Sequence, residues 1–133
     1  MKKNIILILV ISLFLSGCGC EKEKVFNMDE LADDNKYHYE NIDLNFKIDL
    51  PQEFIYYQTQ RKKVDNRIDI EFFVPTNDVD YIQEVPGYAK PIVVRAENGE
   101  YDLKFWEIVP NDWEERWSED MENEIINSFE VKQ

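Results

Sequence analysis

The chain of 133 residues has few of the residue types on which many functional sites depend. Its four glycines are too widely spread to form a phosphate-cradling loop or a dinucleotide-binding turn. One histidine, His38, and two cysteines leave little material for zinc sites or Cys–His nucleophile pairs. Basic residues are also scarce, with 15 Lys and Arg against 28 Asp and Glu, a formal net charge of −13. This balance argues against nucleic-acid binding, and the length fits one ordinary domain.

The most informative segment is the N-terminus. Lys2 and Lys3 precede an apolar run, residues 5–15, which only Ser12 interrupts. As a helix, this run would be about 16 Å long, roughly half the hydrocarbon thickness of a bilayer, so it is too short to span one. A short basic segment followed by such a run is typical of a signal peptide. We therefore expect an exported protein.

The apolar run ends in Leu15-Ser16-Gly17-Cys18. All four positions resemble the lipobox of bacterial lipoproteins. The resemblance implies cleavage before Cys18, a diacylglyceryl group on its sulfur and often a third acyl chain, such as palmitate, on the new amino group. Two or more chains anchor a protein stably, at ~0.8 kcal/mol per buried CH₂. Cys20 is the alternative lipidation site, but no aliphatic residue stands three positions before it. The expected location is the bacterial cell membrane, inner or outer.

The remaining chain divides into a charged segment and a patterned one. Residues 18–40 are rich in charge and lack strand alternation, so we expect a solvated tether with a mean reach of roughly 25–30 Å. The signal peptide is expected to cover residues 1–17. Residues 41–133, after the tether, are expected to fold alone as a single α+β domain. Because the chain is so acidic, we expect the domain to stand off anionic lipid.

Alternation of apolar and polar residues predicts the strands. It is clearest over residues 42–50, which Pro51 ends, and it recurs over residues 68–74. Residues 54–59 are a further candidate, with a polar turn at 60–66, and residues 76–90 form the longest irregular stretch. Asn98-Gly99 predicts a type I′ hairpin turn, which would place Arg95 opposite Asp102.

After residue 110 the apolar period becomes helical. The stripe recurs at every fourth position, in Trp113, Trp117, Met121 and Ile125. Asn111 or Asp112 is the expected N-cap, and residues 129–131 are a candidate for a last short strand. The predicted fold is α+β: an antiparallel sheet of about five strands with a C-terminal helix packed on one face.

Two segments of the domain resemble PsbP-like proteins. They are Phe46-Lys47-Ile48-Asp49-Leu50-Pro51, a strand that ends in Leu-Pro, and Ile125-Ile126-Asn127-Ser128-Phe129, the end of the helix. The family includes an extrinsic subunit of the oxygen-evolving complex of photosystem II and short bacterial lipoproteins. The resemblance brings no catalytic residue and implies a binding or assembly module.

The sequence offers only weak candidates for chemistry. His38 lies between two tyrosines, without an evident partner that would make it a general base. Asp78, Asp80 and Glu84 could offer oxygen atoms to Ca²⁺, but their spacing does not fit an EF-hand loop. Aromatic residues exceed the needs of a small core and could form a recognition patch or a tyrosine-rich sheet face: Tyr56, Tyr57, Tyr81, Tyr88 and Trp106.

These observations favour a lipid-anchored binding or assembly module of the cell envelope. We expect a protein partner there, no catalytic residue, no cofactor, no metal and no nucleic acid. The alternative is an acidic inhibitor or immunity-type lipoprotein that covers a basic partner surface. A small hydrolase or metal-dependent enzyme is a third class, which would need a pocket with converging polar groups.

Overall fold

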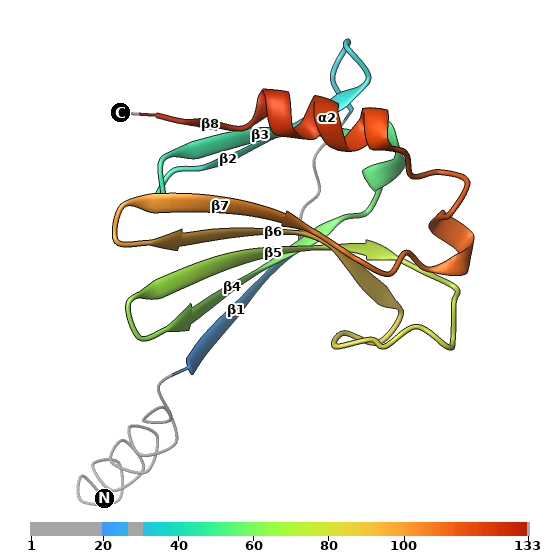
Figure 1. Ribbon diagram of the computed structural model, residues 1–133, viewed down its shortest axis with the longest axis horizontal. Coiled ribbons are helices and arrows are strands. Elements are labelled where there is room, and N and C mark those ends of the chain that lie inside the picture. The colour runs from blue at the N-terminus through green and yellow to red at the C-terminus, as the bar shows by residue number, and fades with distance from the viewer. Residues whose placement is uncertain (1–19, 27–30, 133) are drawn as a thin grey trace, which may run out of the picture.

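The computed structural model describes the backbone of residues 20–26 and 31–132 and the side chains of residues 31–132. In this part of the chain, eight strands form two antiparallel sheets and one α-helix precedes the last strand (Figure 1). The predicted signal peptide and Cys18 lie outside the described residues. Within them, no helix has the length and apolar character needed to cross a membrane.

The larger sheet has the strand order β1-β4-β5-β6-β7. Its strands are β1 (Cys20–Phe26), β4 (Gln58–Val64), β5 (Arg67–Pro75), β6 (Tyr88–Glu97) and β7 (Glu100–Phe105). The smaller sheet, β2-β3-β8, consists of β2 (Lys36–Asn41), β3 (Phe46–Pro51) and β8 (Glu130–Val131). The helix α2 covers Glu119–Ser128, and two 3-10 turns are η1 (Gln52–Phe54) and η2 (Asn111–Trp113). The α+β class is confirmed, but the predicted single sheet of about five strands is wrong.

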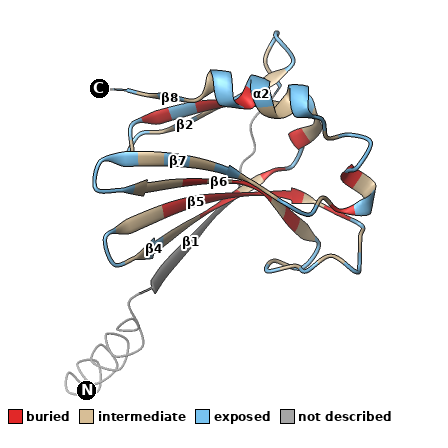
Figure 2. Ribbon diagram, in the orientation of Figure 1, coloured by how far each residue is buried: buried red, intermediate tan, exposed pale blue. Residues whose placement is uncertain are grey.

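The hydrophobic core lies between the two sheets. The ring of Tyr39 on β2 meets that of Phe72 on β5 edge-on, with 4.9 Å between centroids. Phe46 on β3 similarly packs against Tyr101 on β7, and Figure 2 shows buried positions along β5 and β6. The sequence pattern does not separate the two sheets, because a period-two alternation marks a strand but not the sheet that the strand joins.

The charged segment predicted as a tether contains two strands. β1 pairs with β4 from Cys20 opposite Val64 to Phe26 opposite Gln58, so main-chain hydrogen bonds hold an edge strand that has little apolar alternation. In β2, Tyr37 is buried and His38 is exposed, so a period-two pattern is present there. The prediction of an unstructured tether is therefore wrong for both strands.

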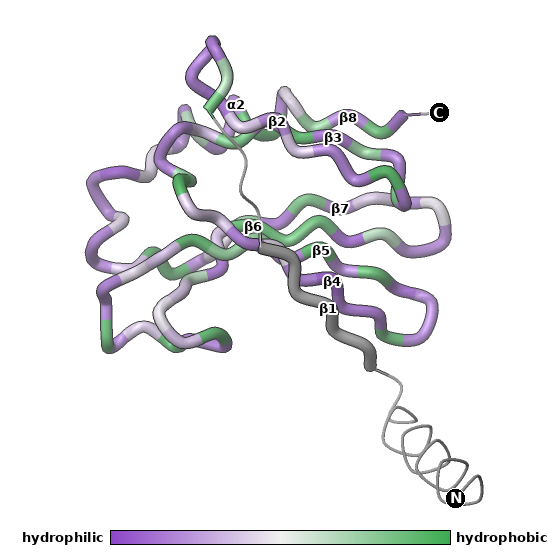
Figure 3. Tube along the Cα trace, turned by 180° about the vertical axis from the view of Figure 1, so that it is seen from behind, coloured by the Kyte–Doolittle hydropathy of each residue, from purple (hydrophilic) through white to green (hydrophobic). Residues whose placement is uncertain are grey.

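The position of β4 also differs from the prediction. Residues 60–64 of this strand were predicted to be part of a polar turn, whereas most of the predicted strand at residues 54–59 forms turns, with Tyr56 at φ 63°. Figure 3 shows β4 as largely hydrophilic beside the hydrophobic β5 and β6. A polar strand forms here because β5 offers its side chains a hydrogen-bond partner. Gln60 Nε2 donates to the buried carboxylate of Glu71 on β5 at 2.8 Å.

The Asn98-Gly99 hairpin is confirmed, with positive φ at both residues and the predicted register between β6 and β7. Arg95 does lie opposite Asp102, but its guanidinium turns to the other neighbouring strand. Its Nε donates to Asp69 Oδ1 at 3.0 Å, because that carboxylate is buried and needs a partner.

The C-terminal helix is shorter than predicted. Ser118 caps it, since its hydroxyl accepts a hydrogen bond from the Met121 amide at 3.2 Å. Asp112 cannot serve as the cap because its carboxylate accepts from the Thr76 hydroxyl and the Asn77 amide. Trp113 and Trp117 thus precede the helix, although the indole of Trp113 is buried as expected.

α2 lies along β3 on the side away from β2, where it continues the line of β8. The Asp49 amide, which faces this side of β3, donates to the hydroxyl of Ser128 at 2.9 Å. β8 is confirmed as a short strand and pairs with Phe46 and Lys47. The helix and β8 together cover an edge of β3 that would otherwise be exposed to pairing.

Candidate functional site

A pocket of about 480 Å³ opens where β5 ends, β6 begins and β7 ends. This volume is in the range of small-ligand sites. Its apolar wall consists of Phe73, Tyr81, Ile82, Tyr88, Trp106 and Ile108. Its charged lining consists of Asp80, Glu84, Lys90 and Glu107. Opposite Phe73, the pairing of β5 with β6 shifts register: β6 has two residues, Lys90 and Pro91, where β5 has one. Bulges of this kind are frequent next to functional sites.

The loop of residues 76–87 forms one side of the pocket and is held by its own polar groups. The Thr76 amide donates to the Gly87 carbonyl at 2.9 Å and closes the loop. Asp78 accepts from the amides of Asp80 and Asn111, at 3.0 and 2.9 Å. Asp78 therefore organises the loop, a role that the sequence analysis did not assign to it.

Asp80 and Glu84, the other two residues considered for Ca²⁺, line the pocket instead. In the part of the chain that the structure describes, no three His, Cys, Asp or Glu residues come together in a group that could hold a metal ion.

The opposite side of the pocket is the segment that follows β7. The Trp106 amide donates to the Pro91 carbonyl at 3.0 Å, which keeps this segment beside β6. The indole of Trp106 packs against those of Trp113 and Trp117, with centroids 5.8 and 5.1 Å apart. Its Nε1 is buried and has no hydrogen-bond partner among the described residues. All three tryptophans of the chain thus form one cluster, in which Trp106 lines the pocket.

Two isoleucines at the rim are unusually exposed. Ile82 is 89% exposed and Ile108 is 74% exposed, from opposite sides of the pocket. Exposed apolar side chains beside a cavity are typical of interaction sites. Neither isoleucine was predicted as a site residue; the available signal in the sequence was an isoleucine in each of two segments without regular structure.

The lysine of the pocket is neutralised by two carboxylates. Lys90 Nζ lies 2.9 Å from Glu71 Oε2 and 2.7 Å from Glu84 Oε1. Burial lowers the pKa of Lys90, but the hydrogen bonds to Glu84 and Glu71 outweigh it, so the pKa is raised overall. Burial also raises the pKa of Tyr81. Lys90 is therefore a fixed cation that completes an ion-pair network.

His38 lies outside this pocket, on β2 of the smaller sheet. Its Nδ1 is 2.6 Å from Asp49 Oδ1, and its Nε2 is 2.9 Å from Asp34 Oδ2. The hydrogen bond to Asp49 is the main cause of the raised pKa of His38. Because a carboxylate occupies each ring nitrogen, the imidazole is poorly placed to accept a proton from a substrate.

The five aromatic residues singled out from the sequence are divided between three environments. Tyr81, Tyr88 and Trp106 come together in the pocket, Tyr57 is 1% exposed in the core, and Tyr56 is 65% exposed. The recognition patch stays a prediction, and the pocket brings three of its five residues together.

No protein-family model matches the chain, and neither a curated protein nor a solved structure matches it. The resemblances to lipoproteins and to PsbP-like proteins stay predictions.

Proposed function

We propose that this protein is a lipid-anchored binding or assembly module of the cell envelope, and that the pocket is its binding site. The observation that carries the proposal is the pair of exposed isoleucines, Ile82 and Ile108, at the rim of a cavity of about 480 Å³. Water contact with such side chains is unfavourable, and a partner that covers them would gain about 25 cal/mol per Å² of buried apolar surface. We assign no catalytic residue.

The strand geometry supports an anchor at Cys18. β1 begins at Cys20, so two peptide steps of at most about 7 Å would separate the lipidated residue from the sheet. Cys20 pairs with Val64 beside the β4–β5 turn, whereas Phe26 pairs with Gln58, which pairs with Phe73 of the pocket. The strand carries the chain roughly 20 Å between these ends.

A lipid on Cys18 would therefore hold one end of the larger sheet at the membrane and present the pocket at the other. Figure 1 shows this separation, with the β4–β5 and β6–β7 turns at one end and the loop between β5 and β6 at the other. This arrangement suits a module that receives a partner from the aqueous side.

The alternative is an acidic inhibitor that covers a basic surface. Asp80 and Glu107 on the pocket favour it, because carboxylates near a binding site attract basic partners. Salt separates the two functions. Binding to an inhibitor's basic target would be lost steeply as ionic strength rises, whereas binding through the apolar rim would keep its apolar contribution and weaken less.

Partner recovery from membranes tests the module. The double variant Ile82→Ser and Ile108→Ser, in the lipidated protein, is expected to lower recovery of cross-linked partners by about tenfold or more. Ile42→Ser is the matched control, because Ile42 is 77% exposed on the turn between β2 and β3. Equal recovery by the double variant and the control would overturn the proposal.

The anchor is tested by the mature mass and by Cys18→Ala. We expect the mature protein to begin at a lipidated Cys18 and the variant to leave the membrane fraction. A mature N-terminus elsewhere, or an unchanged distribution of Cys18→Ala, would contradict the anchor.

A further inference from the structure

We infer that the pocket accepts a cationic apolar segment of a partner protein, in which an apolar side chain enters the cavity beside Lys or Arg. This inference rests on the proposed function and names the chemistry that the site recognises. Two independent features of the pocket lead to it: the sign of its uncompensated charge and the character of its walls.

The uncompensated charge is negative. Among the lining residues, Asp80, Glu84 and Glu107 face a single cation, Lys90. Lys90 is already engaged by Glu84 and by Glu71, a further carboxylate whose side chain is only 3% exposed. An anionic ligand would have to take Lys90 from these partners and leave the buried carboxylate of Glu71 without its cation, at considerable cost. A basic ligand needs no such rearrangement.

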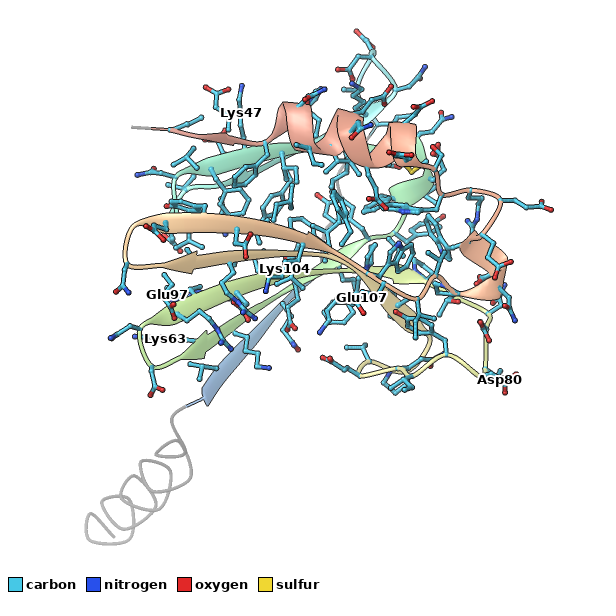
Figure 4. All side chains as sticks on the ribbon, viewed as in Figure 1. Lys47, Lys63, Asp80, Glu97, Lys104 and Glu107 are labelled. Carbon is cyan, nitrogen blue, oxygen red and sulfur yellow. The ribbon has the colours of Figure 1, made fainter. Side chains whose placement is uncertain are left out.

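Asp80 and Glu107 stand at two sides of the opening. Asp80 belongs to the loop between β5 and β6, and Glu107 follows β7; both lie at the same end of the larger sheet, away from Glu97 (Figure 4). Both residues are exposed, so an ammonium or guanidinium at the rim can reach them without being stripped of all its water.

The walls suit the rest of such a segment. Tyr81, Tyr88 and Trp106 offer aromatic faces, which attract both aliphatic groups and cations. Ile82 and Ile108 extend the apolar surface outwards. An apolar side chain next to a positive charge therefore matches both the apolar walls and the acidic rim, whereas an acidic or fully polar segment lacks the positive charge, the apolar group or both.

Two matched peptides test the inference: acetyl-Lys-Leu-Phe-Lys-amide and acetyl-Glu-Leu-Phe-Glu-amide, titrated into the protein and followed by NMR of the Ile82 and Ile108 methyl groups. We expect the basic peptide to bind about tenfold more tightly than the acidic one. Asp80→Asn with Glu107→Gln should remove most of this preference. Glu97→Gln with Asp102→Asn is the matched control and should leave it unchanged.

Equal or tighter binding of the acidic peptide would overturn the inference while leaving the pocket as a binding site. Absence of methyl shifts with either peptide would also overturn it. A simultaneous failure of the isoleucine double variant to lower partner recovery would show that the proposed function fails as well. An equal loss in the control pair would mean that general charge, and not this pocket, sets the preference.

Discussion

At the scale of single residues, the tryptophans of the cluster differ in burial and in the hydrogen bonds of their indole groups. Trp113 is 1% exposed, and its Nε1 donates to the Pro75 carbonyl at 2.9 Å, so it fills the core and ties η2 to the end of β5. Trp117 is only partly buried, and its Nε1 donates to Glu122 at the start of α2. The burial of Trp113 is the more complete, so its truncation removes more contacts.

Trp113→Ala is therefore expected to lower the free energy of unfolding by about 3–5 kcal/mol, a large share of the stability of a small domain. Trp117→Ala should cost clearly less, and Glu119→Ala, at an exposed position, almost nothing. Urea denaturation followed by circular dichroism measures all three. A larger loss for Trp117→Ala than for Trp113→Ala would contradict this assignment.

His38 gives the fold a dependence on pH. Its hydrogen bond to Asp49, and then the charges of Asp49 and Asp34, raise its pKa above the ordinary value of 6.5. Because protonated His38 is favoured in the folded state, this stabilisation is fully present below pH 6.5 and is lost as pH rises through the raised pKa.

We expect the unfolding midpoint in urea to decrease over that interval, by a small amount because His38 is half exposed. Since His38 is the only histidine, His38→Gln should remove the change. NMR titration should give a pKa above 6.5 in the native protein and a lower one in Asp49→Asn. A pKa at or below 6.5 in the native protein would refute the assignment.

At the scale of elements, α2 depends on Ser118 for its start. The Ser118 hydroxyl satisfies the amide of Met121, one of the donors that a helix N-terminus leaves without a partner. Ser118→Ala should cost about 1 kcal/mol in thermal or urea unfolding. Asn111→Ala should cost little, because the helix does not begin there. The opposite ranking would support the longer helix that the tryptophan spacing suggested.

Some elements could be predicted from local pattern alone. The β6–β7 hairpin has its register fixed by Asn98-Gly99, and β5 alternates clearly between apolar and polar residues. β1 and β4 could not be predicted, because neither sequence alternates between apolar and polar residues, and their pairing with neighbouring strands is visible only in the fold. The helix start was misplaced because Asp112, a good cap by residue type, is engaged by Thr76 from a distant loop.

The pocket could be predicted only in part, for a similar reason. Tyr81, Tyr88 and Trp106 stand out in the sequence as excess aromatics, but they come from three separate segments. Their meeting depends on the order of β5, β6 and β7 in the sheet, which no short-range pattern encodes. The lone isoleucines of the rim are likewise indistinguishable from core residues until the loops are placed.

At the scale of the whole molecule, the folding unit extends further towards the N-terminus than residue 41. Tyr37 is part of the core, and β1 and β2 both precede that boundary. A chain of residues 42–133 would lack both strands and leave unpaired the strand edges that they occupy on β4 and β3.

We therefore expect residues 20–133 to unfold cooperatively in urea with a well-defined near-ultraviolet circular dichroism signal, and residues 42–133 to show neither. Limited proteolysis of the unlipidated protein should likewise spare β2. A shorter fragment that matched the cooperativity of the longer one would return the domain boundary to residue 41.

The position of α2 and β8 also affects when the protein can fold during its synthesis. Asp49 and Ser128, which join β3 to α2 by a hydrogen bond, lie 79 positions apart in the chain. The Lys132 amide likewise donates a hydrogen bond to the distant carbonyl of Asn45. Such distant contacts form late and slow the folding of a domain. A nascent chain that emerges N-terminus first must leave the edge of β3 open until residues 119–131, which form α2 and β8, have emerged. That delay suits a protein which, as we propose, has to cross a membrane before it folds.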